Sequence, residues 1–174
     1  MKNLFKITAV AIMCLFFAEN TQAQAFDKGT KNLNVGLGLG YGIGVNASFD
    51  VGIHELISVG VMGGYNVRHY GFGWGNYNVS STAVGARGAL HFGKFVNEAL
   101  NIDDNKFDPY VGIGLGVKIQ KYSDSYTNYY NYSSTYTNPV YIGYLGARYY
   151  FKEKLGVYAE LGFPYNSFGV TFKF

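Results

Sequence analysis

Apolar residues alternate with small or polar residues along eight separate segments of this 174-residue chain. The last segment, residues 168–174, has Phe or Val at every even position and Gly, Thr or Lys at every odd one. Because successive side chains of a strand point to opposite faces, such a segment has one face for hydrocarbon and one for water. Lipid can cover the apolar face when the strands close into a membrane barrel.

The eight segments predict an all-β fold, an eight-stranded antiparallel up-and-down transmembrane β-barrel. Strands of about 9–11 residues cross an outer membrane at a tilt, and most of the segments have lengths near this. A soluble lipocalin-like barrel would reverse the two faces and would leave the many inward glycines unexplained. We expect the first and last segments to pair and close the cylinder. The segments cover residues 32–41, 44–53, 56–68, 77–92, 109–120, 140–151, 155–163 and 168–174.

An even number of strands places both ends of the barrel chain on one side of the membrane, which we expect to be the periplasmic side. The periplasmic connections are then residues 54–55, 93–108 and 152–154. The external connections are residue 42 and the segments 69–76, 121–139 and 164–166.

The first 25 residues have the pattern of a secretory signal peptide. Lys2 and Lys6 precede an apolar run over 7–18, which is followed by the small-residue site Ala23-Gln24-Ala25. We therefore predict a signal peptide over 1–25, cleaved near 23–25, and an outer-membrane barrel domain over 26–174. The sole cysteine lies within the apolar run, so export here does not indicate a disulfide scaffold.

The composition supports strands and excludes several classes of protein. The chain holds 24 Gly, 17 Tyr and 14 Phe but only 3 Pro, and 14% of its residues are charged. After residue 25 it has no apolar stretch of about 18 residues, which excludes a helical membrane protein. The formal net charge of +3 is too small to indicate a nucleic-acid partner.

These features together resemble the small outer-membrane β-barrel family, the OmpA/OmpX-like eight-stranded barrels of Gram-negative bacteria, in the version without a periplasmic domain. The resemblance implies a monomer in the outer membrane, with outer-membrane lipid and the barrel-assembly machinery as partners. It also implies that this machinery reads the closing strand; the alternative is that the same side chains only face lipid. The matching residues are Phe168, Val170, Phe172 and Phe174.

Charged residues fall at inward positions of several predicted strands. Arg87 and Glu160 lie at similar depth, and Arg148 and Asp50 lie closer to the periplasmic ends. Because an unpaired buried charge is costly, we predict an internal network of Glu160, Arg87 and Arg148 with Asp50 near it. Inward glycines leave room for bulky neighbours, so a filled interior is favoured over a pore. A narrow porin-like channel or transport accessory is the alternative function.

The segment 121–139 is rich in Tyr, Asn, Ser and Thr, the composition of binding loops. It predicts a structural or surface-interaction protein whose external loop binds a glycan or a host or cell-surface ligand. The alternative is that Tyr and Thr, as strand formers, extend the fifth and sixth strands as a solvated hairpin. The candidate binding residues are Tyr122, Tyr126, Tyr129, Tyr130, Tyr132 and Tyr136, with Trp74 in a neighbouring connection.

The sequence does not predict an enzyme. The three histidines, His54, His69 and His91, fall at separate places, so neither a three-histidine metal site nor a shared catalytic site is expected. Only Ser80 and Ser81 could approach His69. We therefore expect no catalytic residue, no metal site and no cofactor.

Overall fold

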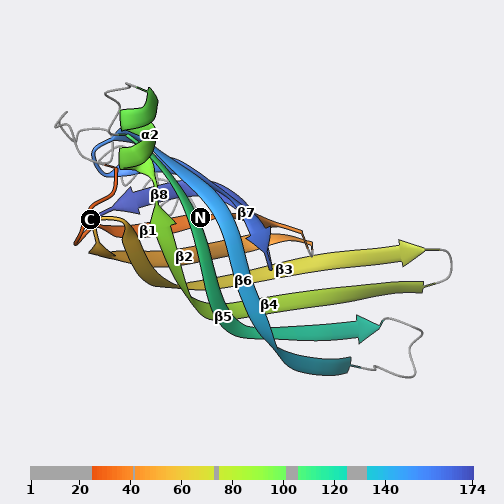
Figure 1. The fold of residues 1–174 in the computed structure, drawn as a ribbon. Coiled ribbons are helices and arrows are strands. Elements are labelled where there is room, and N and C mark those ends of the chain that lie inside the picture. Colours follow the sequence, from red (N-terminus) through yellow and green to blue (C-terminus); the bar gives the residue numbers. More distant parts are fainter. Residues whose placement is uncertain (1–24, 41, 73–74, 101–105, 125–132) are drawn as a thin grey trace, which may run out of the picture.

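Eight strands close into one antiparallel barrel in a computed structural model of the chain (Figure 1). The structure describes residues 25–40, 42–72, 75–100, 106–124 and 133–174. Each strand pairs with the next, and β1 pairs with β8, which confirms the predicted fold class. The elements are β1 (Lys31–Leu39), β2 (Ile43–His54), β3 (Ile57–Phe72), β4 (Gly75–His91), α2 (Gly93–Leu100), β5 (Phe107–Asp124), β6 (Ser133–Lys152), β7 (Leu155–Phe163) and β8 (Asn166–Lys173).

The first and last strands join the ring, as the alternation predicted. β1 and β8 run antiparallel with Leu33 opposite Phe172 and Leu37 opposite Phe168. The Phe174 amide continues this ladder by donating to the Lys31 carbonyl at 2.9 Å. Closure therefore leaves no open edge along the body of the barrel.

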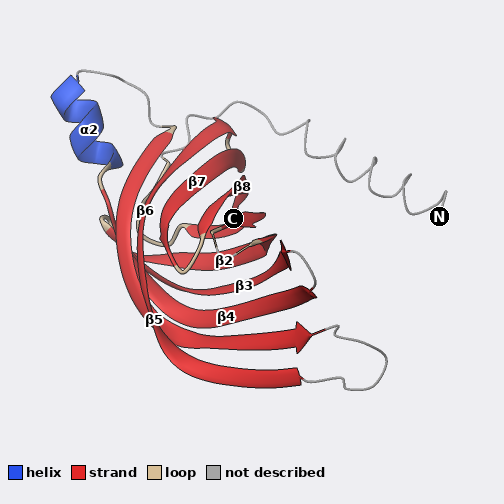
Figure 2. Ribbon diagram, turned by 90° about the vertical axis from the view of Figure 1, so that its right-hand side faces the viewer, coloured by secondary structure: helices blue, strands red, loops and turns tan. Residues whose placement is uncertain are grey.

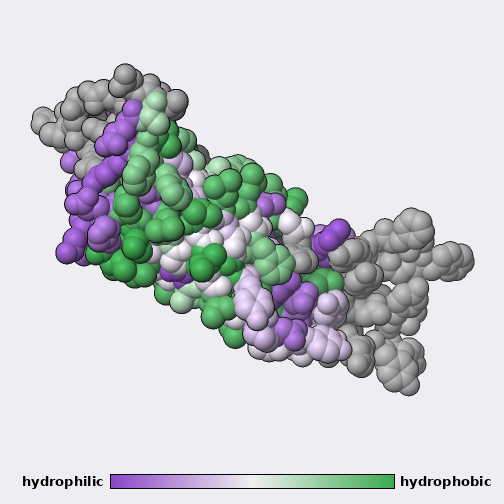
Figure 3. Space-filling model, viewed as in Figure 1, coloured by the Kyte–Doolittle hydropathy of each residue, from purple (hydrophilic) through white to green (hydrophobic). Residues whose placement is uncertain are grey.

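The outer face of the barrel is apolar. Ile113, Leu161 and Val61 are 76%, 67% and 59% exposed, whereas Glu160, next to Leu161 in sequence, is 8% exposed and points inward. Figure 3 shows this apolar surface over the body of the barrel, with polar residues gathered toward its two ends. An apolar exterior around a polar interior is the arrangement of a transmembrane barrel and the reverse of a soluble one.

The two ends of the barrel differ. Both chain ends of the barrel, the β2–β3 and β6–β7 turns and α2 lie at one end, here called the terminal end (Figure 1). At the opposite end, the hairpin end, β3, β4, β5 and β6 continue well past the other four strands (Figure 2). Pairing of β2 with β3 stops at Ile43 and Val67, and pairing of β6 with β7 stops at Gly143 and Phe163. The strands β3–β6 therefore form a four-stranded extension of the barrel wall.

Three predicted connections are wrong in part. Most of 121–139 is strand, because β5 continues to Asp124 and β6 begins at Ser133. The connection 69–76 is shortened in the same way, and β8 begins at Asn166, two residues before the predicted start. Tyr and Thr favour strands even where the alternation is polar, so a search for apolar residues at every second position ends these strands too early.

The predicted coil over 93–108 contains α2 and the start of β5. Its sequence, Gly93-Lys-Phe-Val-Asn-Glu-Ala-Leu100, spaces apolar residues at helical rather than strand intervals. Eight residues give too short a periodic signal to stand out from a polar connection. Within the described part of the chain, no helix has the length and hydrophobicity needed to cross a bilayer.

Candidate functional site

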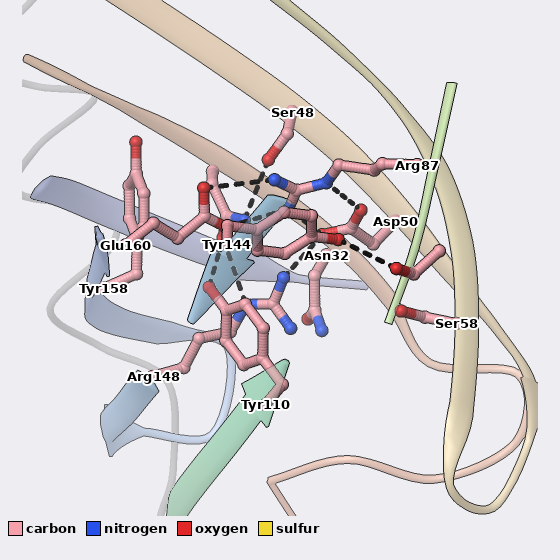
Figure 4. A network of polar contacts seen from close by, with 12 residues as sticks. Asn32, Ser48, Asp50, Ser58, Arg87, Tyr110, Tyr144, Arg148, Tyr158 and Glu160 are labelled. Carbon is pink, nitrogen blue, oxygen red and sulfur yellow. Dashed lines mark hydrogen bonds and ion pairs between the residues drawn. The ribbon is translucent and has the colours of Figure 1, made fainter. Parts of the chain in front are cut away.

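A network of ion pairs fills the interior toward the terminal end (Figure 4). Arg87 on β4 donates two hydrogen bonds to Asp50 on β2, from Nε to Oδ1 at 2.8 Å and from Nη2 to Oδ2 at 2.6 Å. Its Nη1 donates to Oε2 of Glu160 on β7 at 3.1 Å. All three side chains are buried. One guanidinium thus joins carboxylates from two other strands, in the paired geometry that makes such contacts strong.

A second guanidinium extends the network across the barrel. Arg148 on β6 donates from Nη2 to Oδ2 of Asp50 at 2.5 Å and from Nη1 to Oδ2 of Asp108 at 3.3 Å. The structure therefore brings Asp50, Arg87, Arg148 and Glu160 together. Asp50 lies at its centre rather than at its margin, because it accepts hydrogen bonds from both arginines.

Tyrosine rings pack over the charges and against wall glycines. Tyr110 donates to Oε1 of Glu160 at 2.8 Å, and the Arg148 guanidinium lies 4.4 Å from the centre of the Tyr110 ring. A Cβ at Gly146 would lie 2.6 Å from that ring. The absence of a side chain on the wall thus allows a bulky ring to cover the cation, a favourable arrangement.

Ser58, His91 and Asp108 form a hydrogen-bonded row that the sequence did not reveal. His91 Nε2 shares a hydrogen bond with Ser58 Oγ at 2.9 Å, and its Nδ1 lies 2.9 Å from Asp108 Oδ1. This is the connectivity of a Ser-His-Asp triad. All three residues are at most 2% exposed, and Asp108 is shared with Arg148. The burial and the sharing assign the row to the internal network.

The chain just before β1 closes the terminal end. The ring of Phe26, 6% exposed, stacks on the imidazole of His91 with 3.5 Å between centroids and 2° between planes. Backbone hydrogen bonds of 2.8 Å join Gly29 and Thr30 to Gly52 on β2. Phe26 therefore covers the network where His91 lies, at the terminal end of the barrel.

The interior toward the hairpin end is polar and includes the buried Lys118 on β5. Tyr158 donates to Asn46 Oδ1 at 3.2 Å, and Ser167 Oγ donates to the Tyr158 hydroxyl at 3.1 Å. A cavity beside Arg87 and Glu160 has a volume of only about 10 Å³. Such a space holds at most one water molecule. Side chains thus occupy the part of the lumen that these residues line.

The inner face of the extended sheet is open at the hairpin end. Tyr122 on β5 and Tyr136 on β6 lie on the face that continues the barrel interior, since Tyr136 is opposite Gln120 and Tyr122 is opposite Val79. Their rings meet edge to face, with centroids 5.8 Å apart, and are 36% and 56% exposed. Because β7 and β8 end lower, no described strand lies opposite them at this height.

The remaining predicted binding residues lie outside the described residues. They are Trp74, Tyr126, Tyr129, Tyr130 and Tyr132. On the closing strand and just after it, Phe168 and Phe174 are 49% and 67% exposed on the outer face.

Of the two serines considered with His69, Ser80 lies on the same outer face of the wall as His69, and Ser81 does not. Ser81 is 1% exposed and faces the interior. His69 lies on the other face of the wall, where its Nδ1 is 2.5 Å from Asn78 Oδ1. Among the described residues, no group of His, Cys, Asp or Glu side chains could hold a metal ion.

The architecture is an eight-stranded up-and-down antiparallel β-barrel, and two bacterial proteins of known structure share this fold. The N-terminal β-barrel domain of Pseudomonas aeruginosa OprF matches with a TM-score of 0.57 and 15% identity, over 84% of this chain and 98% of that one. Ail, the attachment invasion locus protein of Yersinia pestis, in complex with the heparin analogue sucrose octasulfate, matches with a TM-score of 0.55 and 13% identity, over 84% and 99%. No protein-family model and no curated protein matches the sequence. The likeness is one of fold.

Proposed function

We propose that this chain is an integral outer-membrane protein that binds a glycan on the inner face of its extended sheet. The exposed edge-to-face pair of Tyr122 and Tyr136 carries the proposal, because it lies where no described strand covers it. In this proposal the hairpin end is external and the terminal end is periplasmic. The signal peptide predicted over 1–25 would direct export; of these residues the structure describes only residue 25.

The chemistry of this face suits a sugar. Tyrosine offers a large, stiff ring that packs on the apolar face of a pyranose and a hydroxyl that bonds to its rim. Gln120 and Arg68 stand in the same two rows of the sheet and supply an amide and a cation. The bound sucrose octasulfate of Ail, on a similar barrel, makes sulfated sugars the first class to test.

The proposal is tested by measuring how tightly heparin fragments bind to the full chain in vesicles. Replacing Tyr136 by Ser should weaken binding roughly tenfold, equivalent to about 1.4 kcal/mol. Thr137→Ser, on the outer face of the same strand, is the matched control and should bind like the wild type. Unchanged heparin binding by Tyr122→Ser and Tyr136→Ser together would refute this role for the sheet face.

The filled interior supports a structural barrel over the alternative of a narrow porin-like channel or transport accessory. Two guanidinium groups and three carboxylates cross the lumen, and Phe26 covers its base. Planar-bilayer recordings of the purified chain should therefore show no stable large conductance. A stable open level would favour the transport alternative.

The outward aromatic residues of the closing strand support a second role, recognition by the barrel-assembly machinery. We propose that the machinery reads Phe174 and its neighbours Phe168, Val170 and Phe172. Phe174→Ser should then leave unassembled chain in the periplasm in pulse-chase fractionation. Phe163→Ser removes another outward Phe, 45% exposed on β7, and should assemble normally. Equal assembly of Phe174→Ser and Phe163→Ser would contradict recognition by the machinery. The residues of the closing strand would then only contact lipid.

A further inference from the structure

The short helix α2 at the terminal end has an apolar side with no described partner. Phe95 is 54% exposed, and Ala99, one turn later, is exposed beside it. Residues three and four apart share one side of a helix, so Phe92, Phe95 and Ala99 form a continuous stripe. A continuous stripe of exposed apolar residues, unlike a single one, is a candidate contact surface.

The opposite side of α2 is polar and turned to the barrel mouth. Lys94 donates to Oε2 of Glu55 in the β2–β3 turn at 3.0 Å and lies 4.0 Å from Asp27. Lys94 and Asn97 line a small cavity with Phe26 and His91 at the mouth. These contacts set the rotation of the helix, so the stripe faces away from the mouth.

The apolar stripe continues the outer surface of the barrel. Leu90 on β4 is 47% exposed in the outward row, and Phe92 follows it at 37%. Phe107 at the start of β5 is 36% exposed, and the Phe92 amide donates to the Pro109 carbonyl at 2.8 Å. The lipid-facing belt thus passes onto the helix without a polar break at Phe92.

The direction in which α2 runs also fits contact with a lipid bilayer. In Figures 1 and 2 the helix projects to the side of the terminal end instead of continuing along the strands. A helix in this position, with a polar and an apolar side, would lie along the surface of a bilayer whose core surrounds the barrel wall.

We propose that α2 is an interfacial anchor whose Phe95 side inserts into the phospholipid leaflet at the terminal end of the barrel. The proposal rests on the membrane location proposed above, and it adds a second lipid contact beyond the strands. Such an anchor would fix how deeply the barrel sits and would keep the β4–β5 connection beside the membrane. A docked periplasmic protein is the competing occupant.

Tryptophan fluorescence in vesicles of phosphatidylcholine and phosphatidylglycerol tests the anchor. Trp74 is the only tryptophan in the chain, so Trp74→Phe gives a silent background for Phe95→Trp. Emission from position 95 should be blue-shifted and quenched several-fold more by brominated phospholipid than emission from Asn97→Trp, on the side of α2 turned to the barrel mouth. Gel mobility before and after heating verifies that each variant is folded.

A further variant separates failure of the anchor from failure of the membrane location. Ile113→Trp places the probe in the middle of the outward belt. Quenching at position 113, with quenching at position 95 no stronger than at position 97, would overturn the anchor and leave the barrel in the bilayer. Quenching at neither 95 nor 113 would overturn both proposals.

Discussion

At the terminal end of the barrel, charged residues from five strands meet with none more than 8% exposed, whereas at the hairpin end two tyrosines on neighbouring strands are 36% and 56% exposed. The contacts at the terminal end join residues far apart in sequence, such as Arg148 and Asp50. Tyr122 and Tyr136, by contrast, belong to a single hairpin. Long-range contacts across a closed barrel stabilise the whole ring, while a local pair beyond the rim can change without disturbing it. With the proposed glycan binding at the hairpin end, stability and recognition would be separated along the barrel axis.

The largest expected effect comes from removing a buried cation. Arg148→Met leaves Asp50 and Asp108 without one partner each and should lower the free energy of unfolding by about 3–5 kcal/mol. Lys121→Met, at an exposed site near the hairpin end, should change it by less than about 0.5 kcal/mol. Urea unfolding of both variants in the same vesicles measures the difference. Equal stabilities would contradict the division between the two ends.

A smaller effect is expected from filling the space beneath a tyrosine ring. Gly146→Val would push the Tyr110 ring away from Glu160 and should cost about 1–3 kcal/mol. Gly143→Val on the same strand is the matched control, because nothing lies within 4 Å of a Cβ built there. Urea midpoints that fall equally for both variants would mean that loss of glycine from the wall, rather than ring packing, sets the stability.

The hairpin end should tolerate the loss of its tyrosines. Tyr136→Ser should alter the free energy of unfolding by no more than about 0.5 kcal/mol, because the residue is 56% exposed and its ring contact with Tyr122 lies within its own hairpin. The same variant should lose heparin binding as proposed above. A large loss of stability here would show that the extension is part of the barrel core and would erase the contrast between the ends.

The smallest effect concerns the ion pair that holds α2. The hydrogen bond to Glu55 raises the pKa of Lys94 above its ordinary value of 10.5. A raised folded-state pKa means that the contribution is complete below pH 10.5 and is lost as pH rises through the higher folded-state value. Thermal midpoints of Glu55→Gln and the wild type should differ slightly at pH 8 and converge in strong alkali. A difference in thermal midpoint that stays constant from pH 8 to strong alkali would mean that the charge on Lys94 contributes nothing to stability.

The sequence predicted the wall of the barrel well because alternation repeats along every strand. Each inward position on β4, such as Arg87, follows from its outward neighbours, and eight such segments allow few architectures. The charged residues of the network could therefore be proposed from two things alone: their inward position in the alternation and their distance from the strand ends. The partners of these charges were harder to predict. Asp108 lay in a predicted connection. No sequence pattern linked Ser58 to His91, because the pairing of strands brings them together.

The two features for which we propose a function, the tyrosine pair and helix α2, were only partly predictable from the sequence, for different physical reasons. The tyrosines of 121–139 were identified by composition, but their position on strands depended on pairing between β5 and β6. The face that Tyr122 and Tyr136 share follows from register, which the polar sequence alone leaves open. Helix α2 depended on a stripe of a few residues, Phe92, Phe95 and Ala99, too short for periodicity to reveal.

Fractionation of cells expressing the full chain tests the central claim most directly. An integral barrel with a closed polar interior should be recovered in the outer-membrane fraction, resist extraction by alkaline carbonate and migrate faster on gels before heating than after. Recovery in the soluble fraction, or in membranes without any heat-dependent change in mobility, would contradict it.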